Sequence, residues 1–204
     1  MIFKVLFLSI EDLFTKNKRA LIQYGSDYRF TNNIIDFDQY DYLTIWLGYS
    51  HNRLRPYMGS LYSLSDLYFD SNSHGDMLDT VKKLNKIPVF YSYIIGFAAK
   101  YILGLKEYNL ASTKTLCTHG AWFIRNYKNT IVSLYENYSI RIAEYLGRMG
   151  FCVFLIEPGF YQYYNDENGL TGEEMTELFD LIVSIIKRNL PNAAISWDIN
   201  PSNI

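Results

Sequence analysis

The stretch Phe151–Phe160, FCVFLIEPGF, carries the clearest fold signal in the chain. Its first six residues form a short apolar run of the kind found in strands that are buried on both faces of a parallel sheet. Glu157 follows the run directly. The sequence therefore predicts a buried parallel strand that ends at a single carboxylate.

Helical patterns flank this strand on both sides. From Gly120 to Leu146, apolar residues recur at intervals of three and four, which predicts one long amphipathic helix that ends at Gly147–Gly150. After the strand, Thr171 and Glu174 form a capping box that begins a second helix. Pro191 ends this helix, and Ala193–Trp197 is predicted to be the next strand.

The preceding part of the chain continues this alternation less clearly. The aromatic and β-branched run at Tyr42–Tyr49, YLTIWLGY, predicts another buried strand. The remaining expectations are a strand at Phe3–Ser9, a helix within Glu11–Gln23, a long irregular stretch over Ser50–His74, a helix over Asp76–Leu84 and a strand over Val89–Ile94.

Strands that alternate with helices predict an α/β fold with a parallel sheet and right-handed crossovers. We expect one domain over residues 1–204, in which residues 1–40 are poorly readable and residues 50–74 form a long loop. The architecture expected is a parallel-stranded (β/α) barrel or a barrel-like domain. A length of 204 residues is below that of a typical complete eight-stranded barrel, so an incomplete barrel is also consistent with the sequence.

Charge and composition argue against several classes of partner. The net charge of −2 provides no basic field for a nucleic acid. The cysteines, Cys117 and Cys152, have no zinc-ligand spacing, and a disulfide between them stays open. The chain contains no nucleotide-binding, serine-hydrolase or zinc-protease motif, so we expect neither a cofactor nor a metal.

Ile87–Leu105 is the one stretch with a length and apolar character close to those of a membrane span. Pro88, Ser92, Gly96 and Lys100 interrupt it, which favours a strand followed by a loop and a helical turn. The N-terminal apolar residues run into Glu11 without a small-residue cleavage site, so no signal peptide is predicted.

The carboxyl ends of parallel strands are where α/β proteins bind ligands. Two adjacent predicted strands end at Glu157 and Asp198. Partial burial raises the pKa of a carboxyl group and suits it to general acid catalysis. The structural alternatives are that Glu157 caps a helix or pairs with a cation such as Arg125, and that Asp198 forms a turn before Pro201.

Aromatic residues make up 17% of the chain. Trp197, Trp46, Tyr161, Tyr163 and Tyr164 are candidates to stack on the apolar faces of sugar rings, with burial in the core as the alternative. His119 is a candidate to orient Glu157 or a ligand, and capping or packing at the start of the long helix is its alternative role.

The second half of the chain resembles glycoside hydrolases built on (β/α) barrels. The run VFLIEPGF, followed by Leu190–Ala193 and a strand that ends at Asp198, is similar to family 6 cellulases and more loosely to retaining endo-glycanases. This resemblance implies an extracellular enzyme that cleaves a β-linked polysaccharide or oligosaccharide. Glu157 would be its acid/base, and Asp198 would be an accessory carboxylate.

The sequence departs from these families at two positions. Ile94–Phe97 stands where the cellulases carry an acid, and Ile156 stands where the endo-glycanases carry asparagine. One alternative is therefore a non-catalytic glycan-binding or structural protein that retains part of the barrel. Another copy of the chain could also complete the barrel as a homo-oligomer. A small membrane protein that uses Ile87–Leu105 is the third interpretation.

Overall fold

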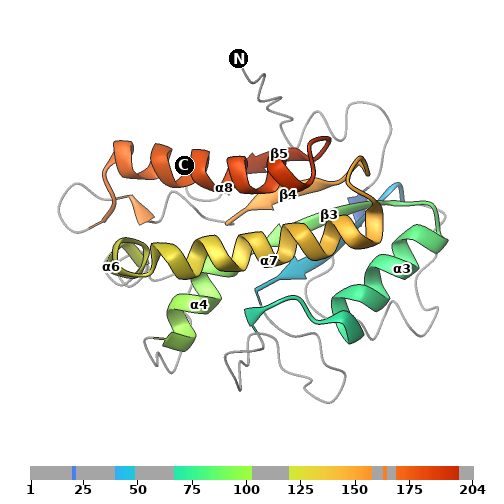
Figure 1. Cartoon of the computed structure of the whole chain (residues 1–204), viewed down its shortest axis with the longest axis horizontal. Helices are drawn as coiled ribbons and strands as arrows, with labels where there is room; N and C mark the ends of the chain where they lie inside the picture. The colour runs from blue at the N-terminus through green and yellow to red at the C-terminus, as the bar shows by residue number, and fades with distance from the viewer. Residues whose placement is uncertain are drawn as a thin grey trace.

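The computed structural model describes residues 20–21, 40–48, 67–102, 120–157, 163–164 and 169–197. The strands of these residues form one parallel sheet, whose spatial order β1-β2-β3-β4-β5 is also their order in the chain (Figure 1). They are β1 (Ala20–Leu21), β2 (Tyr42–Leu47), β3 (Ile87–Ser92), β4 (Val153–Ile156) and β5 (Ala194–Trp197). The predicted α/β fold with a parallel sheet is confirmed.

The helices that follow the strands pack together on one side of the sheet. In Figure 1, α7 (Lys128–Leu146) crosses in front of the strands between α3 (Asp76–Lys83) and α8 (Gly172–Asn189). The shorter helices are η3 (Ser71–Gly75), α4 (Ile94–Ile102) and α6 (Ala121–Asn126).

Both faces of the sheet are apolar. Leu43, Ile45, Phe90 and Phe154 join the main core with the buried residues of the helices. The alternate residues of the same strands form a second buried group on the opposite face: Tyr42, Val89, Val153 and Leu155. Burial on both faces explains why the strands appear in the sequence as continuous apolar runs rather than as alternating ones.

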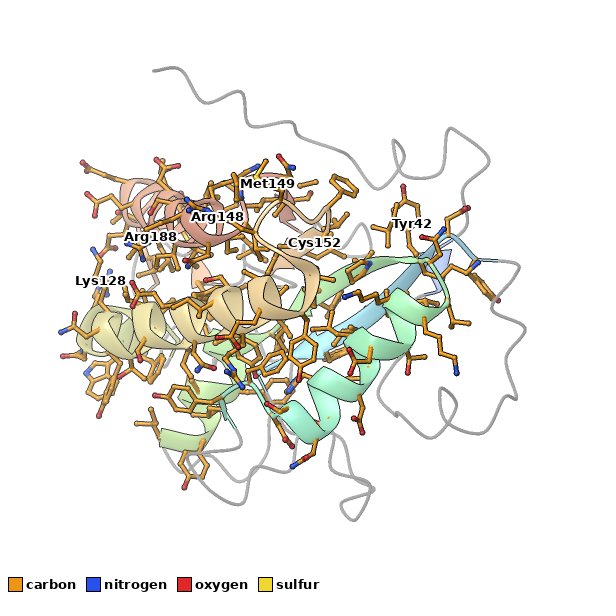
Figure 2. The ribbon with its side chains drawn as sticks, turned by 45° about the vertical axis from the view of Figure 1, so that its right-hand side comes forward. Tyr42, Lys128, Arg148, Met149, Cys152 and Arg188 are labelled. Carbon is orange, nitrogen blue, oxygen red and sulfur yellow. The ribbon has the colours of Figure 1, made fainter. Side chains whose placement is uncertain are left out.

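Local signals set the bounds of several elements close to where the sequence predicted them. The Thr171 hydroxyl accepts the Glu174 amide and the Glu174 carboxylate accepts the Thr171 amide, so the capping box at α8 is confirmed. The turn between α7 and β4 is tied to α8 by a bond from Arg148 to the Arg188 carbonyl oxygen. Figure 2 shows Arg148 and Met149 on this turn, close to Arg188.

The single helix predicted over Gly120–Leu146 is wrong in one respect, because it is divided into α6 and α7 at Tyr127. Tyr127 has φ −121° and ψ 28°, and its amide donates to the Phe123 carbonyl oxygen at 2.8 Å. Its ring stacks on Phe123 with centroids 4.9 Å apart. The apolar periodicity continues through Tyr127, so the sequence pattern did not reveal the break.

Two other predictions need correction. Ala20 and Leu21, placed in a helix by the sequence, form β1, because their backbone pairs with Tyr42 and Leu43 of β2. The stretch predicted to be irregular up to His74 ends in η3, where the Asp70 carboxylate accepts the Asn72 amide. The predicted strand at Phe3–Ser9 and residues 50–66 lie outside the described residues.

Residues 87–102 of the membrane-span candidate Ile87–Leu105 form β3 and α4, separated by Tyr93 alone, and residues 103–105 lie outside the described residues. The predicted strand is therefore present, but α4 begins without the expected loop. Within the described part of the chain, no helix combines the length and the apolar character needed to cross a bilayer.

Gly48 marks the end of β2 at a point of close backbone approach. Its φ is +102°, and a Cβ atom there would lie 2.8 Å from the Tyr93 carbonyl oxygen. Its amide donates to the Tyr138 hydroxyl at 2.9 Å. Glycine is therefore required both by the backbone conformation and by the neighbouring strand end.

We expect Gly48→Ala to lower the free energy of unfolding by more than Gly147→Ala. Gly147 also has positive φ, at +78°, but a Cβ atom there meets nothing within 4 Å, so its substitution measures conformational strain alone. That strain costs about 1–3 kcal/mol, and Gly48→Ala adds the clash with Tyr93. Denaturant unfolding of both variants measures the difference, and equal losses would contradict the close approach.

Candidate functional site

The candidate site lies where four neighbouring strands end in one row. Leu47 pairs with Ser92, Ser92 with Ile156, and Ile156 with Trp197. The residues that follow these four in the chain are Gly48, Tyr93, Glu157 and Asp198. Asp198 lies outside the described residues, so the structure describes this rim from Gly48 to Glu157.

Glu157 leaves the strand direction as soon as β4 ends. Its amide still donates to the Ser92 carbonyl oxygen at 2.8 Å, but its φ is +41°. Positive φ is uncommon outside glycine and costs on the order of 1 kcal/mol. The side chain is fully buried, with 0% of its surface exposed. A strained, buried glutamate at a strand end is the kind of feature that clusters at functional sites.

The Glu157 carboxylate lies at the amino end of α4. Oε1 accepts the Ile95 amide at 2.8 Å, and Oε2 accepts the Gly96 amide at 3.4 Å. Oε1 also accepts the hydroxyl of Tyr135 from α7, at 2.9 Å. The free amides and the dipole at a helix amino end favour a negative charge. The carboxylate thus joins β4 to α4 and α7.

Burial dominates the protonation of this group. It raises the pKa of Glu157 to about 7, while the hydrogen bonds from Ile95, Tyr135, Gly96 and Ile94 act in the opposite direction. Among the described residues, no cation contributes to this balance. A carboxyl group that exchanges its proton near neutral pH is suited to act as a general acid or base.

Two buried tyrosines accompany the carboxylate. Burial and the negative charge of Glu157 raise the pKa of both Tyr135 and Tyr163 well above 10, so both hydroxyls keep their protons at neutral pH. The ring of Tyr163 packs against the start of α6, where a Cβ atom on Gly120 would lie 2.5 Å from Cε1. The surroundings of Glu157 are therefore aromatic and hydroxyl-bearing rather than ionic.

The other predicted site residues divide into three groups. Tyr163 and Trp46 are buried, and the Trp46 ring lies 4.7 Å from that of Tyr91 between centroids, so packing accounts for both. Trp197 is placed only by its backbone in β5. Tyr161, His119 and Asp198 lie outside the described residues.

Among the structural alternatives, the geometry shows a helix cap and not an ion pair. The Glu157 carboxylate binds the amino end of α4, whereas the Arg125 guanidinium pairs with both oxygens of Glu174, with Nε 2.7 Å from Oε1. The Arg125 pair joins α6 to the start of α8. It lowers the pKa of Glu174 to about 2, with the hydrogen bond as the largest cause.

Sequence reasoning missed Tyr135 and the backbone of Ile95 and Gly96. The apolar positions that predict the long helix do not include Tyr135, and Ile94–Phe97 was noted only for the acid it lacks. The available signal was Gly96, because a residue without a side chain next to a strand end permits close approach. The bonds of Glu157 to Tyr135 and Ile95 join residues that are 22 and 62 positions apart in the chain, so no local sequence pattern reveals them.

No metal centre is formed by the described residues, among which no three His, Cys, Asp or Glu side chains gather. Cys152 carries a free, buried thiol whose pKa burial raises to about 12. It forms no disulfide with the residues that the structure describes, and Cys117 lies outside them.

Comparison of the chain with protein-family models, curated proteins and solved structures finds no match.

The raised pKa of Glu157 predicts a stability that falls as pH rises. Its folded-state pKa of about 7 lies above the unfolded value of 4.5, so the native state binds more protons between these limits. The free energy of unfolding of the wild type relative to Glu157→Gln should therefore decrease by roughly 3 kcal/mol from pH 4.5 to above pH 7.

Denaturant unfolding of both proteins across this pH range tests the prediction. Subtracting the free energy of unfolding of the variant from that of the wild type removes the contribution of other groups. One of these is Glu174, whose effect on stability appears at lower pH. A difference that is flat over the range would show that Glu157 titrates normally.

Proposed function

We propose that this chain is a carbohydrate-active domain of the (β/α)-barrel type that acts on a β-linked polysaccharide, with Glu157 as its acid/base. The observation that carries the proposal is the burial of this carboxyl group at the carboxyl end of a parallel strand, with a pKa near 7. A glycosidase acid must hold a proton at working pH, and burial raises the pKa of glutamate for this purpose.

The order of the strands supports a barrel-type winding. Each described strand pairs with the next strand in the chain, and the order contains no reversal. In doubly wound sheets the order reverses at the ligand site, whereas successive strands of a (β/α) barrel are neighbours throughout. Helices on one face and a second apolar group on the other match the outside and the filled interior of such a barrel.

The chemistry requires a second carboxylate, for which we propose Asp198. Trp197, the residue before it, pairs with Ile156, the residue before Glu157. In the proposed reaction, protonated Glu157 donates to the glycosidic oxygen as the bond to the leaving sugar breaks. Asp198 either activates water or attacks the sugar, according to the carboxyl separation. Tyr161, Trp197 and His119 remain proposed contacts for the sugar rings.

Glu157→Gln should reduce hydrolysis of β-linked glycans by about 10²-fold or more, because glutamine cannot supply the proton. Glu177→Gln, on the solvent-facing side of α8, is the matched control and should retain wild-type activity. Release of reducing ends from a panel of β-glucans, xylans and mannans measures the effect. Equal rates for wild type and Glu157→Gln would contradict the assignment of Glu157 as the acid/base.

The full burial of Glu157 and its bonds to α4 favour a second candidate function. Capping α4 accounts for this carboxylate without a substrate, as expected of a non-catalytic glycan-binding or structural protein. Such a protein would co-sediment with insoluble polysaccharide and release no reducing ends over long incubation. Binding without release would then select this candidate over the enzyme.

A further inference from the structure

We propose that Tyr135 is the positioning residue of Glu157: with the Ile95 amide it occupies Oε1, so that the acidic proton resides on Oε2. That Oε2 is the atom from which Glu157 donates its proton to a substrate rests on the function proposed above. The location of the proton itself does not, because it follows from the hydrogen bonds around the carboxyl group.

The two carboxyl oxygens have unequal surroundings. Oε1 accepts two short hydrogen bonds, at 2.8 Å from the Ile95 amide and 2.9 Å from the Tyr135 hydroxyl. The Gly96 amide donates to Oε2 over a longer distance, 3.4 Å. A proton on Oε1 would face two donor hydrogens that already point at that oxygen, so protonation at Oε2 preserves both short bonds.

The structure explains why both groups donate a hydrogen bond to Oε1. The Ile95 amide lies in the first turn of α4, where it has no carbonyl partner within the helix. The Tyr135 hydroxyl is buried on α7 and remains protonated, because its pKa is well above 10. Because both of these donors are directed at Oε1, this atom serves as the carbonyl-like oxygen of the acid.

In the described part of the chain, the ionisable groups that face Glu157 from the surrounding elements are tyrosines. Tyr135 comes from α7. The negative charge of Glu157 also raises the pKa of Tyr163, which shows that the two groups interact. Tyr93, at the end of β3, acts on Tyr163. Residues 94–99 of α4 carry no ionisable side chain. Both Tyr135 and Tyr163 are coupled to Glu157 by a side-chain hydrogen bond, and the bond from Tyr135 lowers the pKa of Glu157.

Tyr135→Phe tests this assignment, with Tyr138→Phe as its matched control. Tyr138 lies one turn further along α7 and is equally buried, but its hydroxyl accepts the Gly48 amide and has no bond to Glu157. Infrared difference spectra against Glu157→Gln follow the carboxyl band of Glu157 across pH without any substrate.

In Tyr135→Phe we expect the titration midpoint of Glu157 to rise by about one pH unit, because the ionised form loses a charge-assisted hydrogen bond. The C=O band of the protonated form should also move to higher frequency, because Oε1 loses one of its two donors. Tyr138→Phe should change neither. An unchanged midpoint and band in Tyr135→Phe would overturn the proposal.

A second variant keeps the test available should Tyr135→Phe fail to fold. Fluorotyrosine at position 135 keeps the ring and the hydroxyl but makes the hydroxyl a stronger donor, so the midpoint should fall and the C=O band should move to lower frequency. No change in either would again contradict the assignment. Absence of glycan hydrolysis by the wild type would refute the proposed enzyme and leave these titrations interpretable.

Discussion

The hydrogen bonds between the Glu157 carboxylate and the amino end of α4 connect the elements around the candidate site. Glu157 belongs to the end of β4, its backbone bonds to β3, and its carboxylate reaches α4 and α7. A buried carboxylate without a cation is costly unless donors surround it. The helix amides and the Tyr135 hydroxyl supply those donors, so the position of α4 and the charge of Glu157 depend on each other.

Helix α7 supports the rim at two points through neighbouring tyrosines. Tyr138 accepts the amide of Gly48 after β2, and Tyr135 donates to Glu157 after β4. The strand between them, β3, ends at Ser92, whose hydroxyl donates to the Leu155 carbonyl oxygen. Three strand ends are thus held together by hydroxyl groups from one helix and one strand. Such buried bonds specify a unique geometry, because a buried donor or acceptor that lost its hydrogen bond would destabilise the fold.

The same carboxylate has two roles with opposite preferences. As a cap on α4 it is best ionised, because a negative charge interacts favourably with the helix amino end. As a buried group it is best protonated, and burial is the larger effect. The balance places its titration near neutral pH, which neither effect alone would do. This balance is what makes the site suitable for proton transfer and gives the proposed function its physical basis.

The sequence by itself determined most of the elements. The apolar runs at Tyr42–Leu47 and Val153–Ile156, the capping box at Thr171 and the stop at Pro191 depend on a few neighbouring residues, so their signals are local. The placement of Glu157 at the carboxyl end of a parallel strand followed from the same signals. The break at Tyr127 and the strand β1 were missed, because the non-helical backbone of Tyr127 leaves the apolar periodicity intact and the pairing of β1 with β2 joins residues distant in the chain.

Only the tertiary structure decided what surrounds Glu157. Its partners Tyr135, Ile95 and Gly96 belong to two other helices, and no sequence pattern linked them to Glu157. Which backbone amides remain free at the start of α4, and which tyrosine of α7 points at the carboxylate, depends on how the helices cross the sheet. Sequence patterns report which face of a helix is buried, whereas the pKa of a buried acid depends on the atoms it meets there.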